Sequence, residues 1–91
     1  MKKIINGKKY DTTTERLICE RDYYDNGNWF STSALFRKKT GEFFIFHNIN
    51  QRELWAKESY IDPITKAEAL KFAEENMDGE DYEAFFGEVE E

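Results

Sequence analysis

The fold is decided by Thr32-Ser33-Ala34-Leu35-Phe36-Arg37, then Lys38-Lys39-Thr40-Gly41, then Glu42-Phe43-Phe44-Ile45-Phe46-His47. A four-residue turn that ends in glycine joins two runs rich in β-forming residues, which is typical of an antiparallel hairpin. In the second run both alternating sets are apolar: Phe43 with Ile45, and Phe44 with Phe46. Strands that read this way are usually buried on both faces. We therefore predict a central strand over this second run.

Two Asn-Gly pairs mark turns nearer the N-terminus. Asn6-Gly7 lies between two short runs within Lys3–Tyr10, and both turn positions tolerate positive φ, so a hairpin is predicted there. Asn26-Gly27 marks a second turn within 25–28. Between them, residues 16–20 could continue as a strand or as one helical turn, and we favour a strand.

The segment after the central strand contains the single proline. Residues 48–52 have the composition of a loop, and residues 54–61 are predicted to hold a further strand. Pro63 lacks a backbone donor and is expected to end that strand.

Two helices are predicted at the C-terminal end. Thr65-Lys66-Ala67-Glu68 has the pattern of a capping box and predicts a helix from Lys66 to Met77. Asp78 can cap a second helix over 79–86, which Gly87 would end. The predicted fold is α+β: a small antiparallel sheet of four to five strands with two C-terminal helices packed on it. We expect a single domain over 1–91, with mainly β hairpins over 1–62, two helices over 63–87 and an acidic tail over 88–91.

The net charge of −6 is unevenly distributed. Residues 1–73 hold 10 acidic and 13 basic groups, whereas residues 74–91 hold nine acidic groups and no basic one. Such a field disfavours contact with nucleic acid at this end and favours a basic protein surface. Solubility and complementation of the helix dipole explain the same carboxylates without a partner. The candidate partner-binding residues are Glu74, Glu75, Asp78, Glu80, Asp81 and Glu83, with Trp29 and Trp55 as candidate aromatic anchors.

The sequence offers little material for catalysis or metal binding. His47 is the only histidine and Cys19 the only cysteine, so an internal disulfide, an all-cysteine zinc site and a two-histidine metal site are excluded. We expect no catalytic residue, no cofactor and no metal. A signal-peptide core and an 18-residue apolar run are also absent, so we expect a cytoplasmic protein without a membrane partner.

Three strings resemble a family of small proteins carried by Gram-positive bacteria, their phages and their mobile elements. The strings are residues 2–12 (KKIINGKKYDT), 35–44 (LFRKKTGEFF) and 81–88 (DYEAFFGE). Small proteins of this genomic type include anti-CRISPR inhibitors that bind a Cas nuclease. The resemblance implies no catalytic residue, and residues 22–31 and 48–57 depart from it.

These observations lead to two hypotheses of function. The first is a non-enzymatic binding protein, a phage or mobile-element inhibitor of a host defence nuclease such as Cas9, whose acidic end occupies a basic nucleic-acid groove. The second is a housekeeping module that binds another protein through its sheet edge or its aromatic residues. Either could act as a monomer or as a homodimer.

Overall fold

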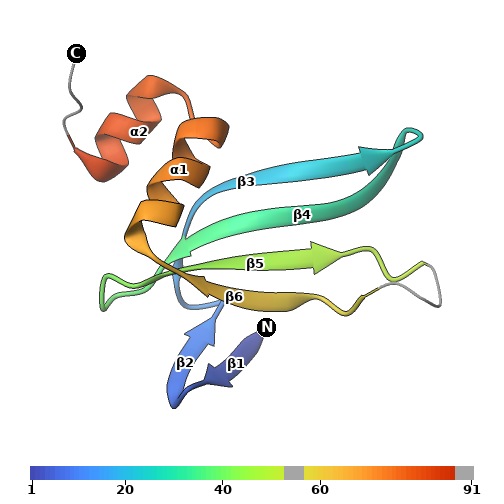
Figure 1. Cartoon of the computed structure of the whole chain (residues 1–91), viewed down its shortest axis with the longest axis horizontal. Helices are drawn as coiled ribbons and strands as arrows, with labels where there is room; N and C mark the ends of the chain where they lie inside the picture. The colour runs from blue at the N-terminus through green and yellow to red at the C-terminus, as the bar shows by residue number, and fades with distance from the viewer. Residues whose placement is uncertain (53–56, 88–91) are drawn as a thin grey trace.

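The computed structural model describes residues 1–52 and 57–87. In the described part, six strands precede two helices (Figure 1). The strands are β1 (Lys2–Ile5), β2 (Lys8–Asp11), β3 (Arg16–Asp25), β4 (Asn28–Arg37), β5 (Phe43–Ile49) and β6 (Tyr60–Ile64). The helices are α1 (Lys66–Asn76) and α2 (Gly79–Phe86). The predicted α+β class is confirmed.

The strands form two antiparallel sheets rather than one. β1 and β2 pair only with each other, and the larger sheet has the order β3-β4-β5-β6. The predicted antiparallel sheet of four to five strands, with two helices packed on it, is confirmed by the four-stranded sheet, and the separate β1–β2 sheet is a feature that the prediction did not contain. The short β1–β2 hairpin packs against one face of the larger sheet and does not extend its edge, because Tyr10 belongs to the core cluster on that face and Ile5 packs against this cluster.

The central strand prediction is confirmed, because β5 lies inside the sheet and its two faces belong to two different core clusters. Phe44 is completely buried and packs with Tyr10, Phe36 and Ile61 on the hairpin side. Its ring stacks on Phe36 at 5.1 Å between centroids and meets Tyr10 edge-on at 5.4 Å. The opposite face packs against the helices through a cluster of Leu35, Phe43, Ile45, Ala69 and Ala73.

Both Asn-Gly turns have the conformation that their sequence predicts. Asn6 and Gly7 have φ values of 52° and 76°, and Asn26 and Gly27 have values of 50° and 79°. Positive φ at both central positions matches the right-handed twist of the flanking strands. β3 is also a strand, as favoured, but β3 and β4 extend to the second turn and are longer than the sequence pattern indicates.

The segment around Pro63 differs from the prediction. β5 includes Asn48 and Ile49, which were predicted to be loop, and β6 begins at Tyr60 and continues through Pro63 to Ile64. Proline is accommodated because β6 is an edge strand, where one row of N–H groups has no partner in the sheet. The expected boundary at residue 62 therefore falls inside a strand, and residues 53–56 and the tail 88–91 lie outside the described residues.

The helices begin and end within one residue of the predicted positions. The Thr65 hydroxyl accepts from the Glu68 backbone N–H at 3.2 Å, and the Glu68 carboxylate accepts from the Thr65 N–H at 3.1 Å. Asp78 caps α2 by accepting from the Asp81 N–H at 2.9 Å, and Gly87 ends that helix with φ of 93°. Both helices lie over one end of the large sheet, so the other end, with the β3–β4 turn, extends away from them (Figure 1).

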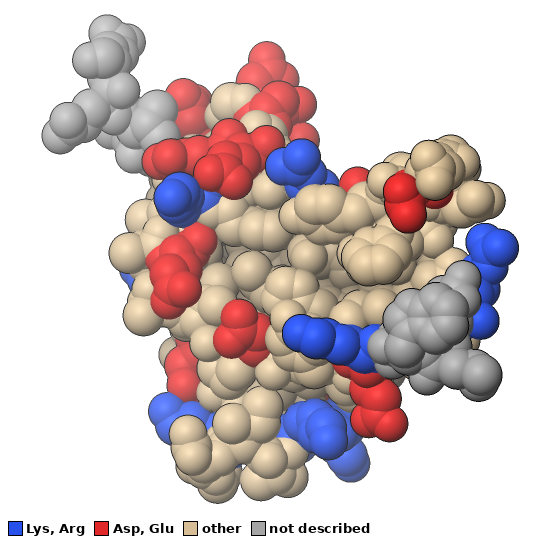
Figure 2. All heavy atoms as spheres, turned by 45° about the vertical axis from the view of Figure 1, so that its right-hand side comes forward, with Lys and Arg blue, Asp and Glu red and all other residues tan. Residues whose placement is uncertain are grey.

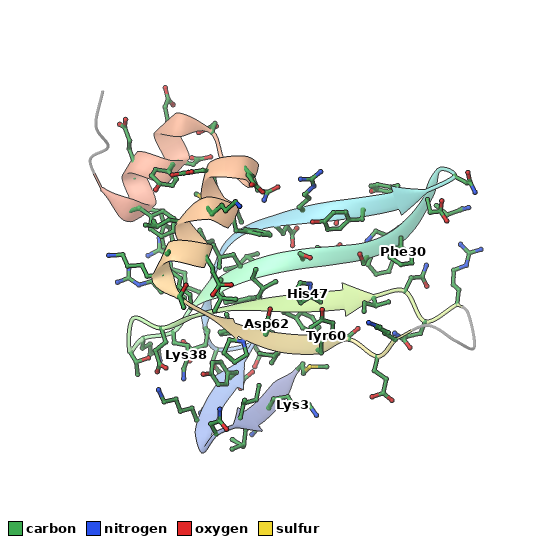
Figure 3. All side chains as sticks on the ribbon, viewed as in Figure 1. Lys3, Phe30, Lys38, His47, Tyr60 and Asp62 are labelled. Atoms are coloured by element: carbon green, nitrogen blue, oxygen red, sulfur yellow. The ribbon has the colours of Figure 1, made fainter. Side chains whose placement is uncertain are left out.

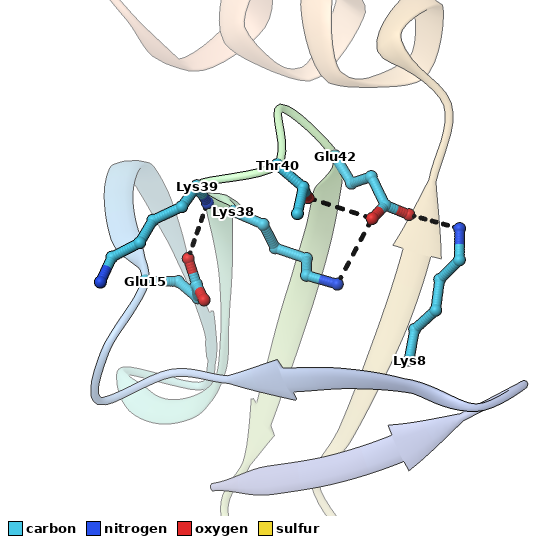
Figure 4. A network of polar contacts seen from close by, with 6 residues as sticks. All are labelled: Lys8, Glu15, Lys38, Lys39, Thr40 and Glu42. Carbon is cyan, nitrogen blue, oxygen red and sulfur yellow. Dashed lines mark hydrogen bonds and ion pairs between the residues drawn. The ribbon is translucent and has the colours of Figure 1, made fainter.

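A polar network ties the first hairpin to the β4–β5 turn (Figure 4). The Glu42 carboxylate accepts from Lys8 Nζ at 2.9 Å and from the Thr40 hydroxyl at 3.0 Å, and it lies 3.5 Å from Lys38 Nζ. The Lys8 hydrogen bond is the main reason why the pKa of Glu42 falls below its ordinary value. Two of the lysines at this end of the molecule are therefore partnered within the chain.

Candidate protein-binding surfaces

The first candidate surface is the acidic end, which we define as Glu74 and Glu75 of α1, Asp78 between the helices, and Glu80, Asp81 and Glu83 of α2. All six side chains are exposed, and none forms an ion pair with a described residue. Figure 2 shows acidic side chains gathered over the helical end of the molecule. The structure therefore brings together the six carboxylates that the sequence analysis selected.

The helices present these carboxylates because their other faces are occupied. Ala69 and Ala73 of α1 are fully buried against the sheet, which turns Glu74 and Glu75 outward. In α2, Phe86 packs 6.0 Å from the Phe43 ring. The guanidinium of Arg16, from β3, lies 4.6 Å from the centroid of the Phe85 ring and marks one margin of the acidic end.

Some carboxylates of the acidic end stabilise α2. The Asp78 carboxylate caps α2, and Glu80 and Asp81 lie in the first turn of that helix, where negative charge stabilises the helix dipole. Glu74, Glu75 and Glu83 have no such role in the described structure. These three glutamates are the most informative positions for testing a docking role.

Trp29 does not belong to the acidic end. It is the second residue of β4, at the opposite end of the sheet, where its indole N–H donates to the Thr32 hydroxyl at 2.9 Å. That hydroxyl in turn donates to the Asp22 carboxylate of β3. Trp29 is half-buried and held against the sheet, so the structure does not place it beside the carboxylates; Trp55 lies outside the described residues.

A second candidate surface is the aromatic end of the sheet, of which the sequence alone had indicated only Trp29. We define it as Tyr23, Tyr24, Trp29, Phe30 and Tyr60. Four of these side chains are exposed: Tyr23 by 39%, Tyr24 by 65%, Phe30 by 56% and Tyr60 by 45%. Figure 3 shows Phe30 on the half of the sheet that the helices leave uncovered. The signal in the sequence was the aromatic content of residues 23–30, whose placement depends on the length of the β3–β4 hairpin.

His47 lies in a polar group between the two surfaces (Figure 3). Its Nδ1 is 3.0 Å from the Ser33 hydroxyl, its Nε2 is 4.0 Å from the Asp62 carboxylate, and its ring stacks on Tyr60 at 4.6 Å. Burial lowers the pKa of His47 below 6.5, and Asp62 offsets part of this effect. Serine, histidine and aspartate also form catalytic triads, but Ser33 is buried and lines none of the described cavities.

The remaining reactive side chain, Cys19, is half-buried beside a cavity between β3 and the helices. Burial raises the pKa of its thiol to about 11, so the thiolate is scarce at neutral pH. Among the described residues, no group of three or more histidine, cysteine, aspartate or glutamate side chains is placed to hold a metal ion. No helix in the described part of the chain has the length and apolar character needed to cross a membrane.

Comparisons with known proteins identify no relative of this chain. The scan against protein-family models finds no match, and no curated protein and no solved structure is significantly similar to the chain.

Proposed function

We propose that the chain is a non-enzymatic binding protein whose acidic end docks into a basic, nucleic-acid-binding groove of a partner protein. The observation that carries the proposal is the acidic end itself: six exposed carboxylates, five on the two helices and Asp78 between them, without an ion pair to any described residue. No lysine or arginine occurs between residues 74 and 87 to offset them.

The physical basis is competition for the cations of such a groove. Lysine and arginine side chains that hold phosphates can be satisfied by carboxylates, and dissolved salt screens such ion pairs, so the binding weakens as the salt concentration rises. Opposite charge also raises the rate of encounter. Combined with the resemblance of the three sequence strings, this favours a phage or mobile-element inhibitor of a host defence nuclease of the Cas9 type.

The direct test is binding to a purified Cas9-type nuclease, with and without its guide RNA, across a salt series. We expect binding at low salt that weakens steeply as salt rises, and loss of nuclease cleavage in the bound state. Absence of binding at low salt would exclude this nuclease as the partner.

A matched pair of variants tests the role of the acidic end. Glu75→Gln with Glu83→Gln removes two exposed charges from the acidic end while leaving the Asp78 cap intact. Glu20→Gln with Glu58→Gln removes two exposed charges elsewhere. We expect the first pair to weaken binding and reduce its salt dependence more than the second. Equal effects would mean that only the net charge matters.

A second candidate function is a housekeeping protein-interaction module that binds through β3. This ten-residue strand is at the edge of the large sheet, and its backbone could pair with an extended segment of a partner. A pull-down from the native host separates the two functions. A partner retained by the Glu75→Gln/Glu83→Gln variant would favour the module, and a partner lost only from that variant would favour the acidic end.

A further inference from the structure

The aromatic end is a surface that neither the core nor the acidic end explains. Tyr24 and Phe30 are more than half exposed although each is large and apolar enough to stabilise a core. A hollow of about 750 Å³ opens beside Trp29 and Phe30, and Ile49 and Tyr60 also line it. Exposed and half-buried apolar side chains gathered around a hollow, here Trp29, Phe30, Ile49 and Tyr60, are typical of an interface.

The charges around this hollow have opposite signs on opposite margins. Asp25 stands on the β3–β4 side, while Arg52 and Lys57 stand beyond the end of β5 and before β6. Because the sheet order is β3-β4-β5-β6, these two margins are separated by the aromatic residues. None of the three charged groups forms an ion pair within the described residues. Figure 2, which brings this end forward, shows mainly uncharged side chains on it, with charged ones at its margins.

We propose that the aromatic end binds a second copy of this chain and forms a two-fold symmetric dimer. In a two-fold interface the same patch meets itself, so a patch must be self-complementary. An axis that sets the β3–β4 margin of one copy against the β5–β6 margin of the other places Asp25 opposite Arg52 and Lys57, twice. Trp29, Phe30 and Tyr60, which line the hollow, then lie in the centre of the interface, where large side chains contribute most.

The acidic end cannot play this role, because a patch with only negative charge repels its copy. In the proposed dimer the two acidic ends point away from each other, since the helices lie at the opposite end of the sheet (Figure 1). Their separation then exceeds the Debye length of roughly 8 Å at physiological salt, so their repulsion is screened. The dimer does not depend on which partner the acidic end binds.

Sedimentation equilibrium of the full chain, from micromolar to millimolar concentration, tests the proposal. We expect a concentration-dependent monomer–dimer equilibrium. Phe30→Asp should weaken the dimer by at least about tenfold, because the charge would be buried twice. Ile4→Asp is the matched control: Ile4 is 64% exposed but lies on β1, so this variant should dimerise like the unchanged protein.

A charge-reversal experiment identifies the surface without relying on an aromatic substitution. Two variants are needed: one carries Asp25→Lys, and the other carries both Arg52→Asp and Lys57→Asp. Each variant by itself should dimerise weakly, because like charges then meet at both margins. An equimolar mixture of these two variants should associate, since both margins again carry opposite charges. A monomer at every concentration, or a mixture that fails to associate although each variant keeps its circular dichroism spectrum, would overturn the proposal.

Discussion

The ammonium group of Lys38 lies 4.2 Å from the centroid of the Tyr10 ring, and Lys38 is only 8% exposed. Tyr10 belongs to β2, and Lys38 follows directly after β4, so this contact joins the small hairpin to the large sheet. Glu42 balances the buried charge at 3.5 Å. The face of a tyrosine ring attracts a cation, and removal from water strengthens this attraction.

We therefore expect Lys38→Met to lower the free energy of unfolding by about 1 kcal/mol, since methionine keeps the apolar stem but removes the cation. Urea unfolding monitored by circular dichroism measures this difference. Lys39→Met is the control, because the Lys39 side chain is exposed and the contact of this residue with Glu15 uses its backbone N–H. A Lys38→Met variant as stable as the unchanged protein would show that burial of the charge cancels its attraction to the ring.

The parts of the fold that the sequence predicts depend on neighbouring residues. Three predicted features each depend on residues that are close together in the sequence. They are the turn at Asn6-Gly7, the capping box of Thr65–Glu68 and the apolar residues on both faces of β5. The layer formed by β1 and β2 was not predicted, because it depends on Tyr10 reaching Phe44 far along the chain.

The two candidate surfaces also differ in whether their residues are close together in the sequence. The acidic end was predictable because its six carboxylates lie within ten successive residues, on helices with clear caps. The aromatic end joins Tyr60 to residues 23–30, and this proximity arises only from the strand order and register of the large sheet. The separation of Trp29 from the acidic end has the same cause.

Leu35 tests the helix-facing core. It is completely buried, and Leu35→Ala should lower the free energy of unfolding by about 2–5 kcal/mol through lost burial and the remaining cavity. Leu17→Ala removes the same atoms from a side chain that is 47% exposed and should cost less than about 1 kcal/mol. Similar losses from both substitutions, measured by thermal or urea unfolding, would contradict the assigned core.

His47 makes stability depend on pH near neutrality. Its pKa is lowered by burial from 6.5, so the unfolded chain binds a proton more readily than the folded one. Stability should be greatest above pH 6.5 and should fall as pH drops from there through the lower pKa of the folded state. His47→Gln should flatten this part of the profile, measured as the urea midpoint between neutral and mildly acidic pH. An unchanged slope would place the responsible group elsewhere.

Thr65 tests the start of α1. Thr65→Ala removes the hydroxyl that accepts from the Glu68 N–H and should cost about 1 kcal/mol of stability. Thr65→Ser keeps an acceptor and should recover most of the loss. Thr14→Ala, at an exposed threonine outside the strands and helices, is the control and should change stability little. Hydrogen exchange of the α1 amides would show whether the loss begins at the first turn.

Two glycines should respond to alanine in opposite directions. Gly27 has φ of 79°, so alanine there adopts a left-handed conformation that is strained although nothing lies within 4 Å of the new Cβ. We expect Gly27→Ala to lower stability by about 1 kcal/mol.

Gly79 lies in the first turn of α2, where open space also surrounds a new Cβ and the backbone is helical. Gly79→Ala should raise stability by about 0.5–1 kcal/mol, because alanine loses less backbone freedom on folding. Since both sites have room, a difference in sign between the two variants in urea unfolding isolates the backbone conformation as its cause.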